Sequence, residues 1–239
     1  MQHLQLPDMD HSTIVQHLKD EIRLLGDKYG QCTVVINYGG PLNNAVSVLG
    51  EEILATCKSQ PELAKQVLQK MGEVVMAAYD QLFCPYNGIS PSASREQPFG
   101  IGDCPVGMIA PATYKAVVLP ADLWLRSQFH AYFNLHHCGI FDAYTEVYQG
   151  LYPTNLDLGP GSDLRLARQA FPQAGISAYI DVGALSRMDR EAIDAMIGKM
   201  VADASPVALF TGITVAEAGT EIADETVIQL MTVRERLHL

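Results

Sequence analysis

The stretch AYFNLHHCGIFDAY (Ala131–Tyr144) places an apolar run directly before two histidines, a cysteine and a glycine. The run predicts a buried strand, Gly139 the tight turn after it, and Phe141 onward the start of a helix. Because side chains alternate along a strand, His136 and Cys138 should point the same way at its end. An imidazole nitrogen and a thiolate sulfur on one side make half of a zinc site. The alternative is a buried cysteine beside two histidines that bond to loop backbone.

The composition is typical of a globular enzyme with one sizeable core. The chain has 239 residues, of which 48% are hydrophobic and 18% are charged, which is enough for one large or two small domains. A formal net charge of −11 argues against nucleic acid as a partner, since binding to it needs a basic surface. The five cysteines are widely spaced and include no CxxC pair, which favours reduced thiols in a cytoplasm over a secreted disulfide framework. We also expect no membrane partner, because no apolar run of about 18 residues occurs.

Strands and helices alternate along the chain. Helices are predicted over residues 11–29, from Pro41, from Pro61, over about 141–149, up to Phe171, after Asp189 and over about 221–237. Six strands are predicted, at residues 32–37, about 99–103, 131–136, 154–159, 176–181 and 206–212. From residue 131 onward, strand and helix repeat in the rhythm of a parallel α/β sheet. Residues 84–98 are rich in proline and serine and predict a loop, which at that length is often functional.

Polar residues follow several of the predicted strands. In both common parallel architectures, sites form at the carboxyl ends of the strands, so these residues are the site candidates. For any single aspartate, a helix cap or a loop anchor is the ordinary alternative. The candidates are Asn37, Tyr38, Asp103, Cys104, His136, His137, Cys138, Asp157, Asp181 and Thr211.

Several segments, in their order and spacing, resemble the uroporphyrinogen decarboxylase-like superfamily, and most closely its zinc-dependent corrinoid methyltransferase branch. The similar segments are GPLNNAVSVLGEE (Gly40–Glu52), SQPELAKQVLQKM (Ser59–Met71), GMIAPATYKAVVLPADLWL (Gly107–Leu125), LHHCG (Leu135–Gly139) and LDLGPGSDLRLARQAFP (Leu156–Pro172). The resemblance implies a single (β/α)₈ barrel domain over residues 1–239 that lacks its first strands.

The resemblance also implies a chemistry. His136 and Cys138 match the zinc pair of the methyltransferases, in which zinc activates a substrate thiol to take the methyl group of a methylated corrinoid on a partner protein. Asp103 and Asp157 would be the catalytic carboxylates, as orienters of the ligands or as substrate contacts. Tyr38, His137 and Thr211 would bind substrate.

Two departures from the family pattern stand out. Thr211 occupies the position at the end of the last strand where the methyltransferases have their third zinc ligand, a cysteine. Cys104 is the best substitute for the third zinc ligand by chemistry, and Glu146 and Glu217 are alternatives. A zinc site that has lost its function is the remaining alternative. The arginine and aspartate that bind substrate in the true decarboxylases belong to the absent N-terminal part, which argues against porphyrinogen decarboxylation.

Three functions therefore compete. The first is zinc-dependent methyl transfer from a corrinoid to a thiol. The second is a decarboxylase-type lyase acting on a tetrapyrrole or a small acid, with Asp103, Tyr38 and His137 around the substrate. The third is a truncated barrel that binds a partner without turnover. A barrel without its first strands leaves open sheet edges, which a partner or a homodimer would cover.

Overall fold

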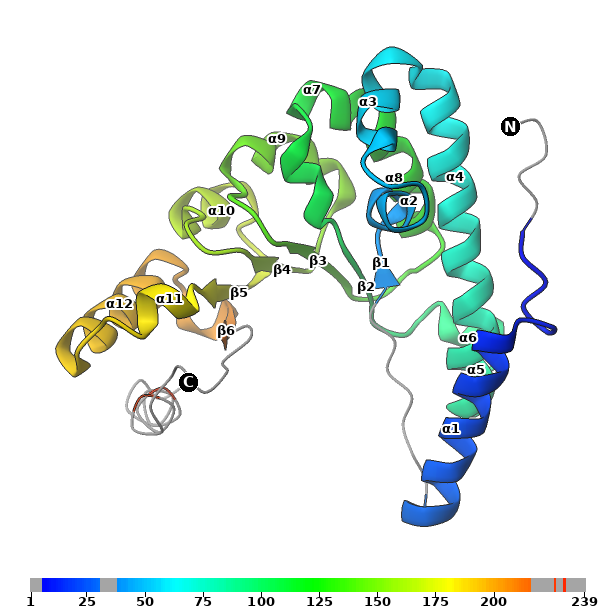
Figure 1. Ribbon diagram of the computed structural model, residues 1–239. Helices are drawn as coiled ribbons and strands as arrows, with labels where there is room; N and C mark the ends of the chain where they lie inside the picture. The colour runs from blue at the N-terminus through cyan, green and yellow to red at the C-terminus, as the bar shows by residue number, and fades with distance from the viewer. Residues whose placement is uncertain (1–5, 31–37, 216–225, 227–229, 231–239) are drawn as a thin grey trace. The chain divides into compact units, whose positions relative to one another are not determined.

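The computed structural model describes residues 6–30, 38–215, 226 and 230 (Figure 1). The chain forms two compact units, residues 1–133 and residues 134–239. Every strand pairing described within a unit is parallel: β1 pairs with β2 in the first, and β3 to β6 pair in chain order in the second. The predicted α/β class with parallel strands is thus confirmed for the described residues, which contain five of the six predicted strands together with the short strand at Tyr38–Gly39. Closure into a barrel and a single domain stay predictions.

The first helix of the first unit, α1 (Thr13–Tyr29), lies within the range predicted for it, residues 11–29. Its N-cap is Ser12, and prolines occupy the first position of the helices at Pro41 and Pro61, where a missing N–H costs nothing. The predicted strand 32–37 lies outside the described residues. The elements are α1 (Thr13–Tyr29), β1 (Tyr38–Gly39), α2 (Pro41–Leu49), α3 (Glu52–Ser59), α4 (Pro61–Ala78), α5 (Cys84–Tyr86), α6 (Pro91–Ser94), β2 (Phe99–Gly102), α7 (Pro111–Thr113) and α8 (Leu119–Ser127).

The core of the first unit forms around α4, which packs against α2, α3 and α8. Its buried face includes Val67, Leu68 and Val75, each of which contributes about 1.5–3 kcal/mol by leaving water. Gly72 lets α8 approach closely, because a Cβ there would lie 3.2 Å from the ring of Trp124. The apolar spacing along α4 therefore determines how these helices pack.

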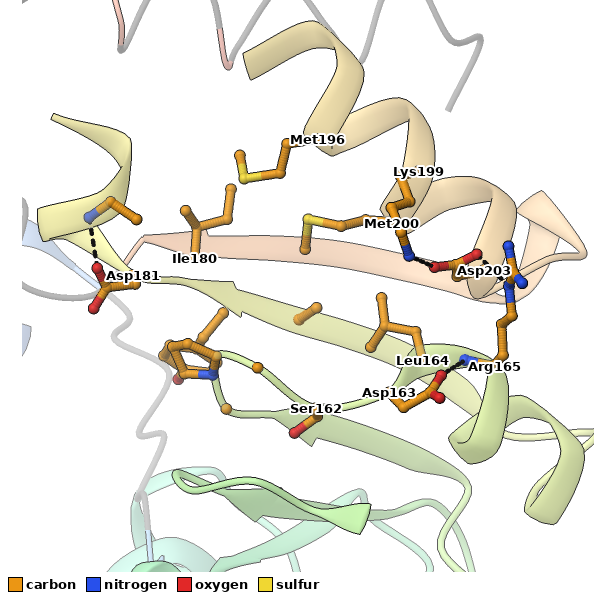
Figure 2. A pocket seen from close by; sticks show the side chains of 16 residues that line it. Ser162, Asp163, Leu164, Arg165, Ile180, Asp181, Met196, Lys199, Met200 and Asp203 are labelled. Atoms are coloured by element: carbon orange, nitrogen blue, oxygen red, sulfur yellow. Dashed lines mark hydrogen bonds and ion pairs between the residues drawn. The ribbon is translucent and has the colours of Figure 1, made fainter. Parts of the chain in front are cut away.

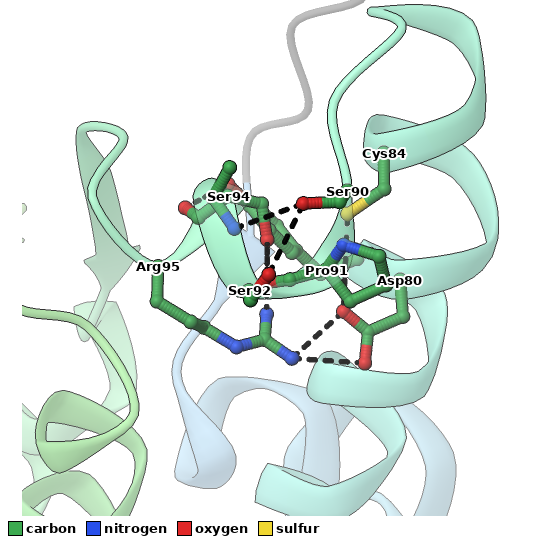
Figure 3. A network of polar contacts seen from close by, with 9 residues as sticks. Asp80, Cys84, Ser90, Pro91, Ser92, Ser94 and Arg95 are labelled. Atoms are coloured by element: carbon green, nitrogen blue, oxygen red, sulfur yellow. Dashed lines mark hydrogen bonds and ion pairs between the residues drawn. The ribbon is translucent and has the colours of Figure 1, made fainter.

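The segment predicted as a loop, residues 84–98, contains the short helices α5 and α6, so the expectation of an irregular loop is wrong for those residues. Figure 3 shows the contacts that hold it. Arg95 donates two hydrogen bonds to Asp80, at 2.8 and 2.9 Å, and Ser90 accepts from the backbone N–H of Ala93 at 3.2 Å. The two charge-assisted hydrogen bonds, both from Nη2 of Arg95, and the helix cap stabilise the segment against the turn that follows α4. Its contacts thus have a structural explanation.

The second unit alternates strands and helices as predicted. Asp163, Asp181 and Asp189 each accept a backbone N–H at a helix start, so Asp181 has the role of a cap. The last strand begins later than the predicted Pro206, because a 3₁₀ turn occupies Val207–Leu209. Of the predicted helix 221–237, Thr226 and Leu230 are helical and the rest lies outside the described residues. The elements are β3 (Phe133–His137), α9 (Thr145–Tyr148), β4 (Asn155–Leu158), α10 (Leu164–Ala170), β5 (Gly175–Ile180), α11 (Val182–Leu185), α12 (Arg190–Asp203) and β6 (Phe210–Val215).

Strand register in the second unit sorts side chains into two faces. His136 on β3 pairs with Asp157 on β4, and Asp157 pairs with Ser177 on β5. Because side chains alternate along each strand, these three polar residues share one face of the sheet, whereas the buried Leu135 and Leu156 belong to the other. The register thus places a row of polar groups where the sequence predicted a site.

Candidate metal and substrate site

The centre of the candidate site is a hydrogen-bonded row on β3, β4 and β5. Nδ1 of His136 lies 2.8 Å from Oδ2 of Asp157, and the hydroxyl of Ser177 donates to Oδ1 of Asp157 at 2.7 Å. Asp157 therefore uses both carboxylate oxygens to hold its neighbours. The row fixes the orientation of the His136 ring from one side.

The charge on Asp157 determines which nitrogen of His136 carries the proton. Burial pushes the pKa of Asp157 up, but the hydrogen bonds from His136 and Ser177 outweigh it and leave the pKa below its ordinary value. An ionised carboxylate can only accept, so Nδ1 of His136 donates to it. The other ring nitrogen, Nε2, is left to act as a ligand or an acceptor.

Cys138 presents its sulfur to that second nitrogen. Its Sγ lies 2.9 Å from Nε2 of His136, and the side chain is exposed. The prediction that the two side chains point the same way agrees with this geometry. Tetrahedral zinc with Zn–N near 2.0 Å and Zn–S near 2.3 Å would separate the two donor atoms by about 3.5 Å. A small side-chain rotation would therefore let both atoms contact one ion.

A second polar row lies one pleat earlier on the same face and was missed by the sequence reasoning. Asn155 donates to Oδ1 of Asn134 at 2.6 Å and accepts from the hydroxyl of Thr211 at 2.8 Å. Gly175 makes room for it, since a Cβ there would lie 2.4 Å from Oδ1 of Asn155. The sequence did contain a signal for this row. Asn134 precedes His136 by two residues and Asn155 precedes Asp157 by two residues, so side-chain alternation places each on the same face as a site candidate. Thr211 is thus engaged with Asn155, and its contact with substrate stays a prediction.

His137 points to the opposite face and is fully buried. It packs against the rings of Phe141, Tyr144 and Tyr148, and its Nδ1 lies 3.1 Å from the hydroxyl of Tyr148. Burial lowers the pKa of His137 to about 4, helped by the neighbouring His136, so the ring is neutral at physiological pH. These contacts are those of a core histidine. A substrate-binding role for His137 stays a prediction.

In the first unit, Asp103 follows β2 and belongs to a buried acid pair. It contacts Asp122 of α8, which accepts a hydrogen bond from the hydroxyl of Tyr114 at 2.7 Å. Burial raises the pKa of Asp103 to about 6, and burial together with the charge of Asp103 raises the pKa of Asp122 well above its ordinary value. Two carboxyls buried together cannot both be ionised, so the pair shares a proton. Nothing in the sequence marked Asp122 as its partner.

The remaining candidates described in the first unit are Tyr38 and Cys104. Tyr38 is buried against the rings of Tyr79 and Phe99, with centroids 5.7 and 5.4 Å away, and burial raises its pKa. Gly40 follows it, and a Cβ there would lie 2.6 Å from Oδ1 of Asp103. Cys104 opens the 3₁₀ turn after Asp103 and is half-buried. Tyr38 is therefore a core aromatic residue, and its role at a site stays a prediction.

The sequence offers Glu146 and Glu217 as alternatives to Cys104 as a metal ligand. Glu146 lies on α9 with an exposed side chain, and it belongs to the same unit as His136. Glu217 lies outside the described residues, as does Asn37. Neither glutamate has a described contact with His136 or Cys138.

A cavity of about 580 Å³ opens beside β5, α10 and α12 (Figure 2). Its apolar lining includes Ile180, Met196 and Met200. The charged residues at its edge pair with one another, since Asp203 accepts from Nε of Arg165 at 2.6 Å and also bonds Lys199. His136 and Cys138 do not line it. We therefore assign the chemistry to the polar row and not to this cavity.

Comparison with known proteins gives a likeness of fold. No family model matches the sequence, and no curated protein sequence matches it. Among solved structures, a methyltransferase from Methanosarcina mazei matches 99% of this chain and 71% of its own chain, with a TM-score of 0.69 and 13% sequence identity. At that identity the likeness shows the fold alone: an α/β fold that is also found in a methyltransferase.

No helix in the described part of the chain is both long enough and apolar enough to cross a bilayer.

Proposed function

We propose that this chain is a zinc-dependent methyltransferase that transfers a methyl group from a methylated corrinoid on a partner protein to a thiol. One observation carries the proposal: Nε2 of His136 and Sγ of Cys138 converge, while Asp157 holds the other ring nitrogen. The fold likeness to a methyltransferase and the resemblance to the uroporphyrinogen decarboxylase-like superfamily support it. The proposal places the enzyme in the cytoplasm.

The donor set fits zinc. Ligating histidines usually give their second N–H to a carboxylate, which fixes the ring and raises its basicity, and Asp157 has this position relative to His136. We take Cys104 as the third ligand, because it follows β2 as Cys138 follows β3. Together the three residues would offer one imidazole nitrogen and two thiolate sulfurs, and a fourth position would remain for substrate.

The chain's own residues would have distinct roles. Asp157 keeps the Nδ1 proton of His136 in place, and Ser177 holds Asp157. Exposure of Cys138 leaves the site open to a small thiol. Bound zinc would lower the pKa of that thiol, so that a nucleophilic thiolate exists near neutral pH. Asp103 is fully buried, which favours a positioning role at the Gly40 turn.

Metal content tests the proposal. Protein purified without added metal should contain about one zinc per chain, and Cys138→Ser should lose it. His130→Ala is the matched control, because His130 is an exposed histidine on the approach to β3 and its loss should leave the zinc in place. Cys104→Ser should weaken zinc binding, whereas Glu146→Gln should not.

An activity assay on the same protein samples is the second test. Zinc-loaded protein should methylate a small thiol with methylcobalamin as donor, and Cys138→Ser should be inactive. Native protein without metal would overturn the proposal. Tetrapyrrole binding would then test the lyase alternative, and failure of both assays would favour a barrel that binds a partner without turnover.

A further inference from the structure

Helix α1 presents an apolar stripe to solvent. The stripe comprises Leu18, Ile22, Leu25 and Tyr29, which are spaced four, three and four residues apart. Leu18 is 40%, Leu25 47% and Tyr29 67% exposed, and Ile22 is half-buried. Val15, one step further along the same face, is buried. Among the described elements, no helix or strand packs extensively against α1.

An exposed stripe with this spacing indicates a helix partner. A helix of 17 residues is marginally stable in water by itself, and most helical stability comes from packing an apolar face. The alternation of four and three residues is the repeat that brings apolar side chains into one seam between two helices. The stripe therefore fits another helix better than it fits a flat surface.

The charges beside the stripe identify the partner. Glu21 and Lys28 lie on the same flank of α1, each just before a stripe residue. When two copies of α1 run antiparallel, Leu18 can face Tyr29 of the partner subunit, and Ile22 can face Leu25 of the partner subunit. This register places Glu21 beside Lys28 of the partner subunit, and by symmetry the pair occurs twice. A parallel pairing would place Glu21 beside Gly26 of the partner subunit, without a charge pair.

We propose that α1 is a dimerisation helix that pairs antiparallel with α1 of a second copy of this chain. The self-complementary charges favour a second copy over an unrelated partner. Four apolar residues from each copy make a small interface, so the dimer should dissociate on dilution. The inference does not depend on the proposed function.

Sedimentation velocity of the full chain over a series of concentrations tests the proposal. The wild type should shift from monomer to dimer as concentration rises, and Leu25→Glu should remain a monomer. Leu24→Glu is the matched control: Leu24 is 67% exposed but lies off the stripe, so this variant should dimerise like the wild type. Circular dichroism checks that both variants retain their helix content.

A charge swap tests the antiparallel register. Glu21→Lys should weaken the dimer at least several-fold by placing two lysines together at each end, and adding Lys28→Glu should restore it. The proposal is overturned by a wild type that stays monomeric at every concentration, by a Leu24→Glu variant as monomeric as Leu25→Glu, or by a swap that does not restore the dimer.

Discussion

Asp157 and Asp103 are both aspartates at the carboxyl end of a parallel strand, one in each unit, yet their environments differ. Asp157 receives hydrogen bonds from His136 and Ser177, and its pKa is lowered despite burial. Asp103 is buried against a second carboxyl, and its pKa is raised to about 6. Burial raises the pKa of both carboxyls, but at Asp157 the hydrogen bonds outweigh burial, whereas at Asp103 burial outweighs the hydrogen bonds with Asp122 and Tyr114. The comparison teaches that the balance of burial against hydrogen-bonding partners, more than position on a strand, determines whether such a carboxyl is charged. A charged carboxylate such as Asp157 can orient a metal ligand, and a carboxyl pair that shares a proton, such as Asp103 and Asp122, can stabilise a buried core.

The largest effect is expected at the buried pair. Asp122→Ala should lower the free energy of unfolding by about 3 kcal/mol, because Tyr114 loses its acceptor and Asp103 loses its partner inside the core. Urea denaturation measures the change. Asp20→Ala, on the exposed side of α1, should change it by less than about 0.5 kcal/mol. An equal effect of the two substitutions would show that the acid pair does not stabilise the first unit.

The next effect concerns the charged carboxylate. Asp157→Asn should reduce zinc affinity about 10–100-fold, because the amide is a weaker partner for the Nδ1 proton of His136, while the free energy of unfolding changes little. Competition with a chelator measures the affinity. Asp181→Asn is the control, since asparagine caps α11 as well as aspartate does. An unchanged zinc affinity of the Asp157→Asn variant would show that Asp157 has no role in metal binding.

The pH dependence of stability sharpens the comparison further. Because the pKa of Asp122 is higher in the folded than in the unfolded chain, the folded state binds the proton more tightly. Its contribution to stability is therefore present at low pH and is lost as pH rises above the ordinary carboxyl range. Asp122→Asn cannot titrate, so its stability should fall less between about pH 5 and pH 8. Urea midpoints across that range measure the slopes, and parallel slopes for the two proteins would contradict the shared proton.

The smallest effect is expected at Ser177. Ser177→Ala removes one hydrogen bond to Asp157 and should cost about 1 kcal/mol or less. Zinc affinity should fall by less than in Asp157→Asn, because the contact of Asp157 with His136 remains. A loss of affinity equal to that of Asp157→Asn would mean that Ser177 does more than hold Asp157.

Much of the local structure could be predicted from the sequence. The helices near residues 11–29 and after Asp189 form as predicted, with Ser12 and Asp189 as their caps, and the helices at Pro41 and Pro61 begin as expected. The last strand was placed too early, because the pattern PVALFTG does not distinguish a 3₁₀ turn from extended chain. The short helices α5 and α6 were missed for a similar reason, since a composition rich in proline and serine is also that of capped helical turns.

Of the candidate site, the sequence indicated His136, Cys138 and Asp157 but not what joins them. Asn134, Asn155 and Ser177 stand inside strands and carry no motif of their own. Their importance depends on which residue of one strand faces which residue of the next. Asp122 was missed because in α8 it resembles a surface residue, and only the packing of α8 buries it.

By itself, the sequence determined where the longer helices begin, the rhythm of parallel strands, and that His136 and Cys138 share a side, because caps, prolines and side-chain alternation act over a few residues. The tertiary structure alone decided that Asp157 faces His136 and is charged, whereas Asp103 faces Asp122 and shares a proton. Those outcomes depend on strand register and burial, which arise from contacts between segments far apart in the chain, and the surroundings of a carboxyl determine its charge.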